Sequence, residues 1–585
     1  MKQFLKMTLA CITGIIIASI ICMFLSFSIM AGIIASTETT TEVSERHSVL
    51  RIDLDKAIVE RTNPDDLADI FNVYGSIYNN QQIGLNLLIN AIKNAETNNN
   101  IDGIYLAFDG MSASPASIQE LRNELLKFKE TGKFIVAYGA SYSNGEYHLA
   151  SVADKILLNP QGSVALSGIQ MQTMFYSELL SKVGVEMEIF KVGTFKSAVE
   201  PYIRTDMSEA NKLQLHTYAD GVWARICDDI ATSRNITTEA INDFANHGDF
   251  LKEPEVAINT GLIDSLCYVD GMKTLLEKLT KKDFKTYYVE DMCQQPEQDK
   301  KAKDQIAIVY ATGGIDDNTA SEMNSEKIAK TLMKLRDNKK IKAVVLRVNS
   351  PGGSAYGSEQ MWHAAELLKE KKPVVVSMGD YAASGGYYMS CNANYIFAQP
   401  NTLTGSIGIF GMFPNLTGAS KKIGVSVDGI KTNEYADLGN TFRPMRNDEK
   451  ELIQAEINRG YELFTSRCAN GRHMSQDSIK AIAEGRVWSG VDALAIGLVD
   501  ELGGLDMAIA KAAELAKINN YVTKNFPAQK SKMEELTDLL SGKSDKKEEK
   551  MLQKALGDNY QIYQAIKNVK EQQGIMAISP YYIIY

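Results

Sequence analysis

Ser384 is the residue of this chain whose surroundings best suit covalent chemistry. It lies in a turn of small residues, 378–388, between an apolar strand and a segment of helical character. Its neighbours are Ala383 and Gly385, so its hydroxyl is unobstructed, and free backbone N–H groups at the first turn of a helix stabilise developing negative charge. The stretch favours a nucleophile, although a serine that only caps the helix would fit it too.

The chain contains one long unit twice, so each copy serves as a control for the other. Residues 101–169 align without a gap with residues 341–409, at a constant offset of 240, and residues 257–264 match residues 493–500 at an offset of 236. Identity in strand cores and turn glycines implies one shared backbone. The identical pairs include Leu106/Leu346, Val136/Val376, Gly145/Gly385, Tyr147/Tyr387 and Pro160/Pro400.

Two positions differ reciprocally between the copies. Ser384 of the second copy aligns with Asn144 of the first, and Lys196 of the first copy aligns with Ala436 of the second. A Ser/Lys pair can therefore form only where the two copies meet. Most lysines are solvated and surface drift produces mismatches, but the reciprocal loss favours one shared site.

A lysine can activate a serine only when its amine is neutral. The serine hydroxyl is inert until a base takes its proton. An exposed lysine, with a pKa of about 10.4, is neutral in well under one per cent of molecules at pH 7. Burial at an interface between the copies lowers this pKa, so we expect Lys196 to be buried there.

The loop at residues 347–354 is the candidate oxyanion hole. It follows a predicted strand and contains Gly352 and Gly353, which allow backbone N–H groups to point at a substrate carbonyl. The N–H of Gly385, directly after the serine, supplies a second candidate donor. The first copy has residues 109–113 at the aligned place and lacks the double glycine. A Pro-Gly-Gly sequence is by itself most often a turn, but its loss together with the serine supports the functional interpretation.

Short β-branched runs alternate with helical patterns in each copy, for example residues 343–348 and 373–376 around a predicted helix at 358–370. This alternation predicts an α/β fold with βαβ units and a largely parallel sheet. We expect a first domain at 47–288 that contributes Lys196, a polar linker at 289–304, and a second domain at 305–520 that contributes Ser384. A tail at 521–585 follows, with amphipathic helices at 533–540 and 551–569, an apolar end at 575–585 and no assignable function.

The N-terminus resembles a membrane anchor. No charged residue occurs between residues 7 and 36, a run longer than the roughly 20 apolar residues that span a bilayer. Lys2 and Lys6 precede this run and Glu38 and Glu42 follow it, so the positive-inside rule places the N-terminus in the cytoplasm and the body outside. Because cleavable signals have shorter apolar cores, we expect residues 1–36 to form an uncleaved transmembrane helix.

The composition indicates which kinds of ligand the chain does not bind. With 45% hydrophobic and 23% charged residues, the 585-residue chain is globular and long enough for several domains. Its net charge of −10 and the lack of a basic stripe argue against nucleic acid. The cysteines form no Cys-x-x-Cys pair and the histidines show no ligand spacing, so we expect neither a metal nor another cofactor. An isolated disulfide stays open.

These motifs together resemble the signal peptide peptidase A family, also called protease IV, in its long, duplicated bacterial form. The resemblance runs from the anchor to about residue 510. It depends on the sequences at 349–354, 382–388, 403–408, 193–201 and 485–490.

The resemblance implies a ClpP/crotonase-like fold, duplicated in tandem, and a Ser/Lys dyad. It assigns Ser384 as nucleophile, Lys196 as general base, Ser406 as the residue that orients the lysine, and the backbone N–H groups of Gly353 and Gly385 as oxyanion donors. The implied substrates are signal peptides left in the membrane after cleavage. The implied assembly is a homotetramer in the bacterial inner membrane, with its catalytic body on the extracytoplasmic side.

Three other functions stay open from the residues alone. A crotonase-type acyl-CoA enzyme would share the fold and a glycine oxyanion hole, but would need neither export nor the Ser/Lys exchange. A histidine-dependent hydrolase would use His363, on the helix after the Gly-Gly loop. A non-catalytic membrane scaffold would use the duplicated domains only for assembly.

Overall fold

The computed structural model describes residues 45–62, 82–281, 283–296, 298–299, 301–317, 323–528 and 574–578, together with residue 43 and scattered residues between 3 and 21. Within this part of the chain no helix is long and apolar enough to cross a membrane. The anchor expected at 1–36 and the tail helices expected at 533–540 and 551–569 lie mostly or wholly outside the described residues.

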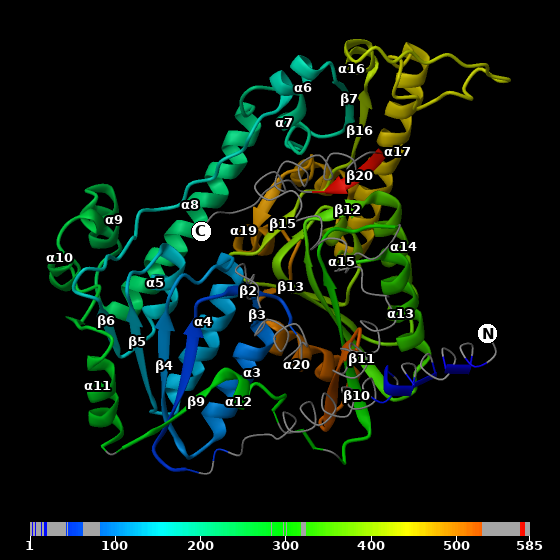
Figure 1. The fold of residues 1–585 in the computed structure, drawn as a ribbon. Helices are drawn as coiled ribbons and strands as arrows, with labels where there is room; N and C mark the ends of the chain where they lie inside the picture. The colour runs from blue at the N-terminus through cyan, green and yellow to red at the C-terminus, as the bar shows by residue number, and fades with distance from the viewer. Residues whose placement is uncertain are drawn as a thin grey trace.

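The first repeat is built on a six-stranded parallel sheet, in the order β8-β6-β5-β4-β1-β9 (Figure 1). Its strands are β1 (Ser48–Leu54), β4 (Ile101–Phe108), β5 (Phe134–Gly139), β6 (Lys155–Leu158), β8 (Ser265–Leu266) and β9 (Lys285–Tyr288), and a small parallel pair is formed by β2 (Ala57–Val59) and β3 (Gln82–Gly84). Its helices are α3 (Leu85–Thr97), α4 (Pro115–Glu130), α5 (Asn144–Ala150), α6 (Ser177–Val183), α7 (Glu200–Ile203), α8 (Glu209–Arg234), α9 (Thr238–Asn246), η1 (Asp249–Leu251), α10 (Glu255–Asn259), α11 (Gly271–Thr280) and α12 (Val289–Met292).

The second repeat has the corresponding sheet, in the order β17-β15-β13-β11-β10-β19, with β14 beside β13 and β18 beside β14. Its strands are β10 (Asp304–Thr312), β11 (Ile341–Ser350), β13 (Val374–Ala383), β14 (Tyr395–Ala398), β15 (Leu403–Gly405), β17 (Val487–Ser489), β18 (Glu501–Leu502) and β19 (Tyr521–Phe526). Its helices are α13 (Ser325–Asp337), α14 (Ala355–Lys369), α15 (Gly385–Ser390), α16 (Thr417–Lys422), α17 (Asn447–Arg472), α18 (Gln476–Ile482), α19 (Gly490–Ala495) and α20 (Leu505–Ala516).

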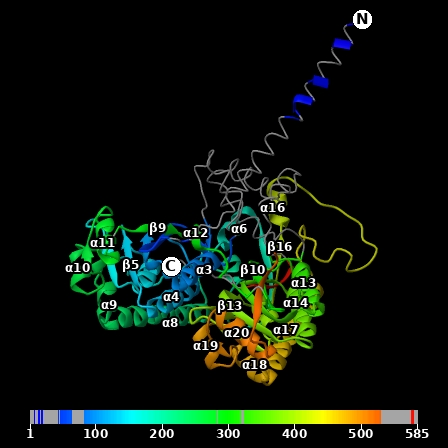
Figure 2. The ribbon, with the colours of Figure 1, turned by 90° about the horizontal axis from the view of Figure 1, so that it is seen from below.

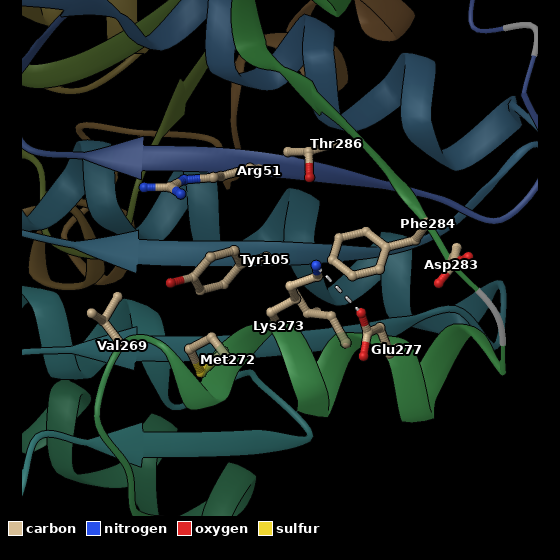
Figure 3. Close-up of a pocket in the computed structure, with 10 residues that line it drawn as sticks. Arg51, Tyr105, Val269, Met272, Lys273, Glu277, Asp283, Phe284 and Thr286 are labelled. Carbon is tan, nitrogen blue, oxygen red and sulfur yellow. Dashed lines mark ion pairs between the residues drawn. The ribbon is translucent and has the colours of Figure 1, made fainter.

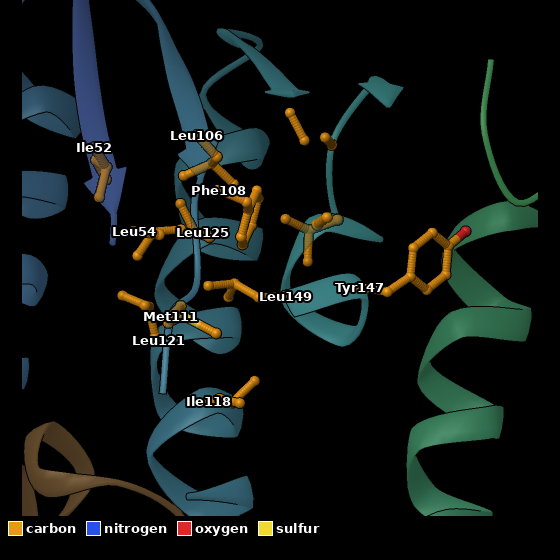
Figure 4. Close-up of a cluster of buried hydrophobic side chains, with 14 of the residues drawn as sticks. Ile52, Leu54, Leu106, Phe108, Met111, Ile118, Leu121, Leu125, Tyr147 and Leu149 are labelled. Atoms are coloured by element: carbon orange, nitrogen blue, oxygen red, sulfur yellow. The ribbon is translucent and has the colours of Figure 1, made fainter. Parts of the chain in front are cut away.

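Helices cover both faces of each sheet, which explains why the strands are apolar almost throughout. In the first repeat Leu106 and Phe108 lie near Leu125 of α4 (Figure 4), while Tyr105 faces Met272 of α11 on the other side. The second repeat repeats this arrangement, with α20 in the place of α11. The matching order of strands and helices confirms the duplication expected from the sequence.

The two repeats lie side by side (Figure 2) and share a four-stranded sheet in the order β12-β20-β16-β7. Strand β7 (Glu186–Lys191) of the first repeat pairs antiparallel with β16 (Phe410–Asn415) of the second. Strands β12 (Gly352–Ser354) and β20 (Gly574–Ile578) complete the sheet. Helix α8 also reaches across, where the Tyr218 hydroxyl donates a hydrogen bond of 2.7 Å to the Asn401 carbonyl.

A buried ion network joins the repeats beneath the 347–354 loop. Arg347 of β11 is almost fully buried and bonds Glu60 at 2.5 Å and Glu120 at 2.7 Å, both from the first repeat. Asn349 bonds Glu60 at 3.1 Å and Asp380 of β13 at 2.9 Å. Removing one partner of such a buried pair leaves an uncompensated charge, at a cost of about 3–5 kcal/mol. The network therefore fixes the loop relative to the first repeat.

The structure adds detail at the expected domain boundaries. The stretch expected to be a linker begins with helix α12, whose Val289 and Met292 are buried, and Asn94 of α3 donates hydrogen bonds to the Met292 and Gln294 carbonyls. The sheet of the second repeat continues beyond residue 520, because β19 pairs with β10. The tail contributes strand β20, which overlaps the apolar end at 575–585; the sequence indicated that this end could dock but not its strand form or its partners.

Candidate active site

Ser384 lies at the sharp turn between β13 and α15. Its backbone has φ 54° and ψ −112°, a conformation that costs a non-glycine residue about 1–3 kcal/mol. Its N–H donates to the Gly405 carbonyl at 2.8 Å, which ties the turn to β15. The hydroxyl makes no capping bond to α15. The interpretation of Ser384 as a simple helix cap is therefore wrong.

The Ser384 hydroxyl meets Lys196 of the other repeat. Lys196 Nζ lies 2.7 Å from Ser384 Oγ, and it donates hydrogen bonds to Ser406 Oγ at 3.0 Å and to the Ser406 carbonyl at 3.1 Å. Both residues of the contact belong to one chain. The structure thus brings together the three side chains that the sequence and the family resemblance singled out.

The lysine amine is shielded from solvent. Lys196 is 1% exposed, Ser384 0% and Ser406 2%. Burial lowers the pKa of Lys196 from 10.5 to about 7. A large fraction of the amine is therefore neutral near physiological pH, as a general base requires.

Glycines give the lysine its space. A Cβ at Gly485, which has φ +77°, would lie 2.6 Å from Lys196 Cβ, and one at Gly408 would lie 3.3 Å from Lys196 Cδ. The turn at residues 484–486 is bonded on both sides: the Glu484 carbonyl accepts from Phe195 N–H at 2.9 Å, and Gly485 N–H donates to the Ile407 carbonyl at 2.8 Å. This turn holds the lysine and the Ser406 loop at a fixed separation.

Sequence reasoning missed Gln214 of helix α8. Its amide donates to the Phe195 carbonyl at 3.1 Å and to Ser197 Oγ at 2.9 Å, and its oxygen accepts from Val487 N–H at 3.2 Å. Gln214 thus clamps both neighbours of the lysine to the second repeat. At an offset of 238, which superposes α8 on α17, buried Gln214 aligns with exposed Leu452. The difference between Gln214 and Leu452 could have indicated this residue, had the comparison of the copies been continued beyond residue 191 at an offset of 238.

The candidate oxyanion loop is held in a conformation that requires glycine. Gly353 has φ +156°, and a Cβ there would lie 2.2 Å from the Ile315 carbonyl oxygen. Below it, Ser350 Oγ donates to the Gly313 carbonyl at 2.7 Å and accepts from Gly352 N–H at 3.2 Å. A Cβ at Gly386 would lie 2.7 Å from the Ser350 carbonyl oxygen, so the loop and the serine turn are in close contact.

The aligned place in the first repeat is filled by its own side chains. Glu146, which replaces Gly386, accepts from Gly110 N–H at 3.0 Å and from Met111 N–H at 2.9 Å. Asn144, which replaces Ser384, donates to the Gly168 carbonyl at 2.9 Å. Ala436, the counterpart of the lysine, lies on an exposed segment between α16 and α17. These replacements close the second site that the duplication would otherwise provide.

Two other sites do not compete with this one. His363 is exposed on α14, so it does not serve as the base for the buried Ser384.

A cavity of about 440 Å³ lies on the first repeat beside α11, where Arg51 stacks over the Tyr105 ring and Lys273 pairs with Glu277 (Figure 3). Its lining contains no serine or cysteine nucleophile.

Known proteins share the sequence pattern of both repeats. The profile of Peptidase family S49 matches residues 127–283 and 366–519, and that of Clp protease matches residues 297–404. Protease 4 of Haemophilus influenzae is 39% identical over 446 residues, which cover 73% of this chain and 72% of that protein. The chain belongs to peptidase family S49.

Other S49 relatives are similar over comparable lengths. Protease 4 of Salmonella typhi is 37% identical, over 78% of this chain and 76% of that protein. The chloroplastic serine protease SPPA of Arabidopsis thaliana is 35% identical, over 76% of this chain and 67% of that protein. The chain is thus a serine protease with duplicated S49 domains of ClpP-like fold, which confirms the resemblance drawn from the motifs. The acyl-CoA enzyme and the non-catalytic scaffold are excluded.

The lowered pKa of the buried Lys196 predicts how activity depends on pH. Below pH 7 the amine is protonated and unable to accept a proton, so kcat/KM for a peptide should rise with pH, reach half its maximum near pH 7 and level off above about pH 8. The profile is measured with an uncharged fluorogenic peptide, so that the substrate does not titrate. A midpoint near 10, as for a solvated lysine, would contradict the assignment.

The contact between Gly485 and Lys196 predicts a selective loss of activity. Gly485→Ala should push the lysine away from Ser384 and lower kcat/KM by about 100-fold, the effect of a misplacement of about 1 Å. Gly497→Ala is the matched control, because Gly497 has φ +80° but meets only Met474 Sδ, at 3.7 Å. Both variants carry similar backbone strain, but the clash with Lys196 should lower the thermal midpoint of Gly485→Ala further, so activity is compared at a temperature where both variants are folded. Equal activity of the two variants would refute the positioning role of Gly485.

Proposed function

We propose that this S49 peptidase is a membrane-anchored endopeptidase that degrades cleaved signal peptides and similar apolar peptides with a Ser384/Lys196 dyad. The observation that carries the proposal is the 2.7 Å contact between Lys196 Nζ and Ser384 Oγ, buried where the two repeats meet. We assign the two ClpP/crotonase-like domains to residues 47–288 and 305–520, with β19 extending the sheet of the second domain.

The dyad acts as follows. Ser384 Oγ attacks the carbonyl carbon of the scissile bond while neutral Lys196 Nζ takes its proton. The resulting oxyanion accepts hydrogen bonds from the N–H groups of Gly353 and Gly385. As the C–N bond breaks, Lys196 returns the proton to the leaving amine. Lys196 Nζ, neutral again, then takes a proton from a water molecule. That water attacks the carbonyl carbon of the acyl-enzyme, and Ser384 is released with its hydroxyl restored.

Ser406 completes the machinery as the residue that orients the lysine. Its hydroxyl and carbonyl both contact Nζ, which leaves the remaining direction of the amine toward Ser384. Ser406 has φ +50° and its N–H donates to the Arg486 carbonyl at 2.7 Å. These constraints fix its position independently of substrate.

Two features support apolar peptides at a membrane as the substrates. The packing next to the lysine is apolar, and its buried members are Ala198, Val199, Phe410 and Met412. The uncharged run at residues 7–36 supports an anchor in the bacterial inner membrane, with the body on the extracytoplasmic side. An enzyme held there meets signal peptide remnants where they accumulate.

The symmetry of the repeats supports a ring of chains, for which the family resemblance implies four copies. Within one chain β7 pairs with β16. Their counterparts at an offset of 240, residues 426–431 and 170–175, form no strand, and residues 170–175 are extended with alternating exposure. Met174 is 68% exposed and Ile430 is fully exposed. Pairing of 426–431 of one copy with 170–175 of the next repeats the internal contact and closes a ring.

Removal of either dyad residue should abolish hydrolysis. Ser384→Ala and Lys196→Ala should each lower kcat by at least about 10³-fold while the thermal midpoint stays within a few degrees. A fluorophosphonate probe should label Ser384 in the native protein. Ser151→Ala, which changes another buried serine, is the control and should keep full activity and labelling. Near-normal hydrolysis by Lys196→Ala would rule out the dyad.

A charge in the unpaired segment should disrupt the assembly. Ile430→Asp should lower the mass measured by light scattering in detergent from four chains to one, because a carboxylate does not fit an apolar strand pairing. Leu251→Asp, at an exposed leucine of η1 outside this segment, should leave the tetramer intact. A monomeric wild-type protein would contradict the ring.

A further inference from the structure

The cavity of about 440 Å³ on the first repeat lies between its sheet and helix α11 (Figure 3). Its volume is within the range of pockets that bind small molecules, about 300–1,000 Å³. In Figures 1 and 2 helix α11 lies on the side of the first repeat that faces away from the second, so the cavity is separate from the dyad. The catalytic machinery therefore does not account for it.

The same place in the second repeat is packed with aliphatic side chains. The strand registers and an offset of 236 between the helices give four replacements from the second repeat to the first: Ile308 by Arg51, Val345 by Tyr105, Ala508 by Met272 and Ala512 by Leu276. In the second repeat all four side chains belong to one buried cluster between α20 and the sheet. The first repeat instead places a guanidinium and a phenol there, although burying polar groups without partners is unfavourable.

The hydroxyl of Tyr105 is a hydrogen-bond donor without a partner in the protein. The side chain is 5% exposed and lines the cavity, and its hydroxyl makes no hydrogen bond to any residue that the structure describes. Burial raises the pKa of Tyr105 to about 12, so the hydroxyl keeps its proton at neutral pH. Buried tyrosine hydroxyls normally have a partner. An acceptor atom of a ligand would supply it.

Arg51 provides a cation beside this hydroxyl. Its Nε donates to Asp53 Oδ1 at 2.7 Å, and its guanidinium carbon lies 5.4 Å from the centroid of the Tyr105 ring and 6.0 Å from that of Tyr288. These contacts fix the orientation of the guanidinium. Its two terminal nitrogens make no hydrogen bond within the described part of the chain, so both are available to the oxygens of an anion.

The acidic side chains of the lining lie at the opposite end of the cavity. Figure 3 shows Glu277 and Asp283 away from the guanidinium, and Glu277 pairs with Lys273 at 3.8 Å. Between the two ends, Met272 and Phe284 contribute apolar surface. A ligand that fits this lining is negatively charged at one end only and apolar along its body.

We propose that this cavity binds a small apolar carboxylate, with its charged end held by Arg51 and the Tyr105 hydroxyl and its body packed on Met272 and Phe284. A carboxylate accepts hydrogen bonds on two oxygens, which matches the free donors of the guanidinium and the phenol. The same group occurs on free organic acids and at the C-terminus of apolar peptides, such as the fragments that a protease releases. Binding at this site does not require the dyad.

Calorimetric titration of the full chain with hydrocinnamate tests the site. Hydrocinnamate should bind at least about ten-fold more tightly than hydrocinnamamide, its neutral amide, because the amide has no charge to pair with Arg51. Tyr105→Phe should weaken binding of the acid about ten-fold and leave the thermal midpoint unchanged, because the hydroxyl has no bond in the protein to lose. Tyr356→Phe, which removes an exposed hydroxyl from α14, is the matched control and should change neither quantity.

Arg51→Gln separates recognition of the charge from apolar packing. This variant should bind hydrocinnamate no more tightly than the amide, while its affinity for the amide equals that of the wild type. Equal affinities of the wild type for acid and amide, no binding of either, or an unchanged affinity of Tyr105→Phe for the acid would overturn the proposal.

A titration with acetyl-Leu-Phe distinguishes the two sources of the carboxylate. The protein carries Ser384→Ala, so the peptide is not cleaved. Tighter binding than that of hydrocinnamate would identify the end of a peptide as the ligand, and weaker binding would identify a free organic acid. Either result supports a carboxylate site, provided that Arg51→Gln weakens it.

Discussion

The site of this S49 peptidase depends on keeping one amine out of water. A solvated lysine is almost entirely charged at neutral pH, so Lys196 can serve as a base only in a dry environment. Neither repeat supplies that environment alone: the lysine turn comes from the first and the surrounding loops from the second. Further contacts between the repeats, among them the Arg347 network, the Gln214 clamp and the 484–486 turn, hold these two parts together.

Duplication gave the chain two similar sheets and one site. In the first repeat Glu146 stands in the place of Gly386 and accepts hydrogen bonds from the N–H groups of Gly110 and Met111, so its side chain fills the region beside the counterpart of the candidate oxyanion loop. The counterpart of the lysine turn in the second repeat is an exposed segment. Each repeat therefore lost a different half of the same machinery, and the geometry of the duplicated fold was kept because both halves are needed to enclose the amine.

The sequence was sufficient for features that both copies preserve or exchange. The shared strand cores predicted the paired sheets, and the reciprocal differences at Ser384 and Lys196 predicted their contact. It was insufficient where the register of the copies shifts, as at Gln214, or where a segment is defined only by distant partners. Strand β20 is five residues long and takes its form from β12 and β16, more than 150 residues earlier, so no local pattern specifies it. The hydrogen-bond partners of Glu146 were also not predictable, because a glutamate in a turn is common and no neighbouring residue specifies which N–H groups it binds.

The distance along the chain between the two partners of the dyad has a consequence for biosynthesis. Lys196 precedes Ser384 by 188 residues, and the turn that packs on the lysine follows a further hundred residues later. A partly made chain that has emerged as far as the first repeat carries the proposed base without the proposed nucleophile. If the proposed dyad carries the activity, hydrolysis therefore begins only when the second repeat has folded onto the first.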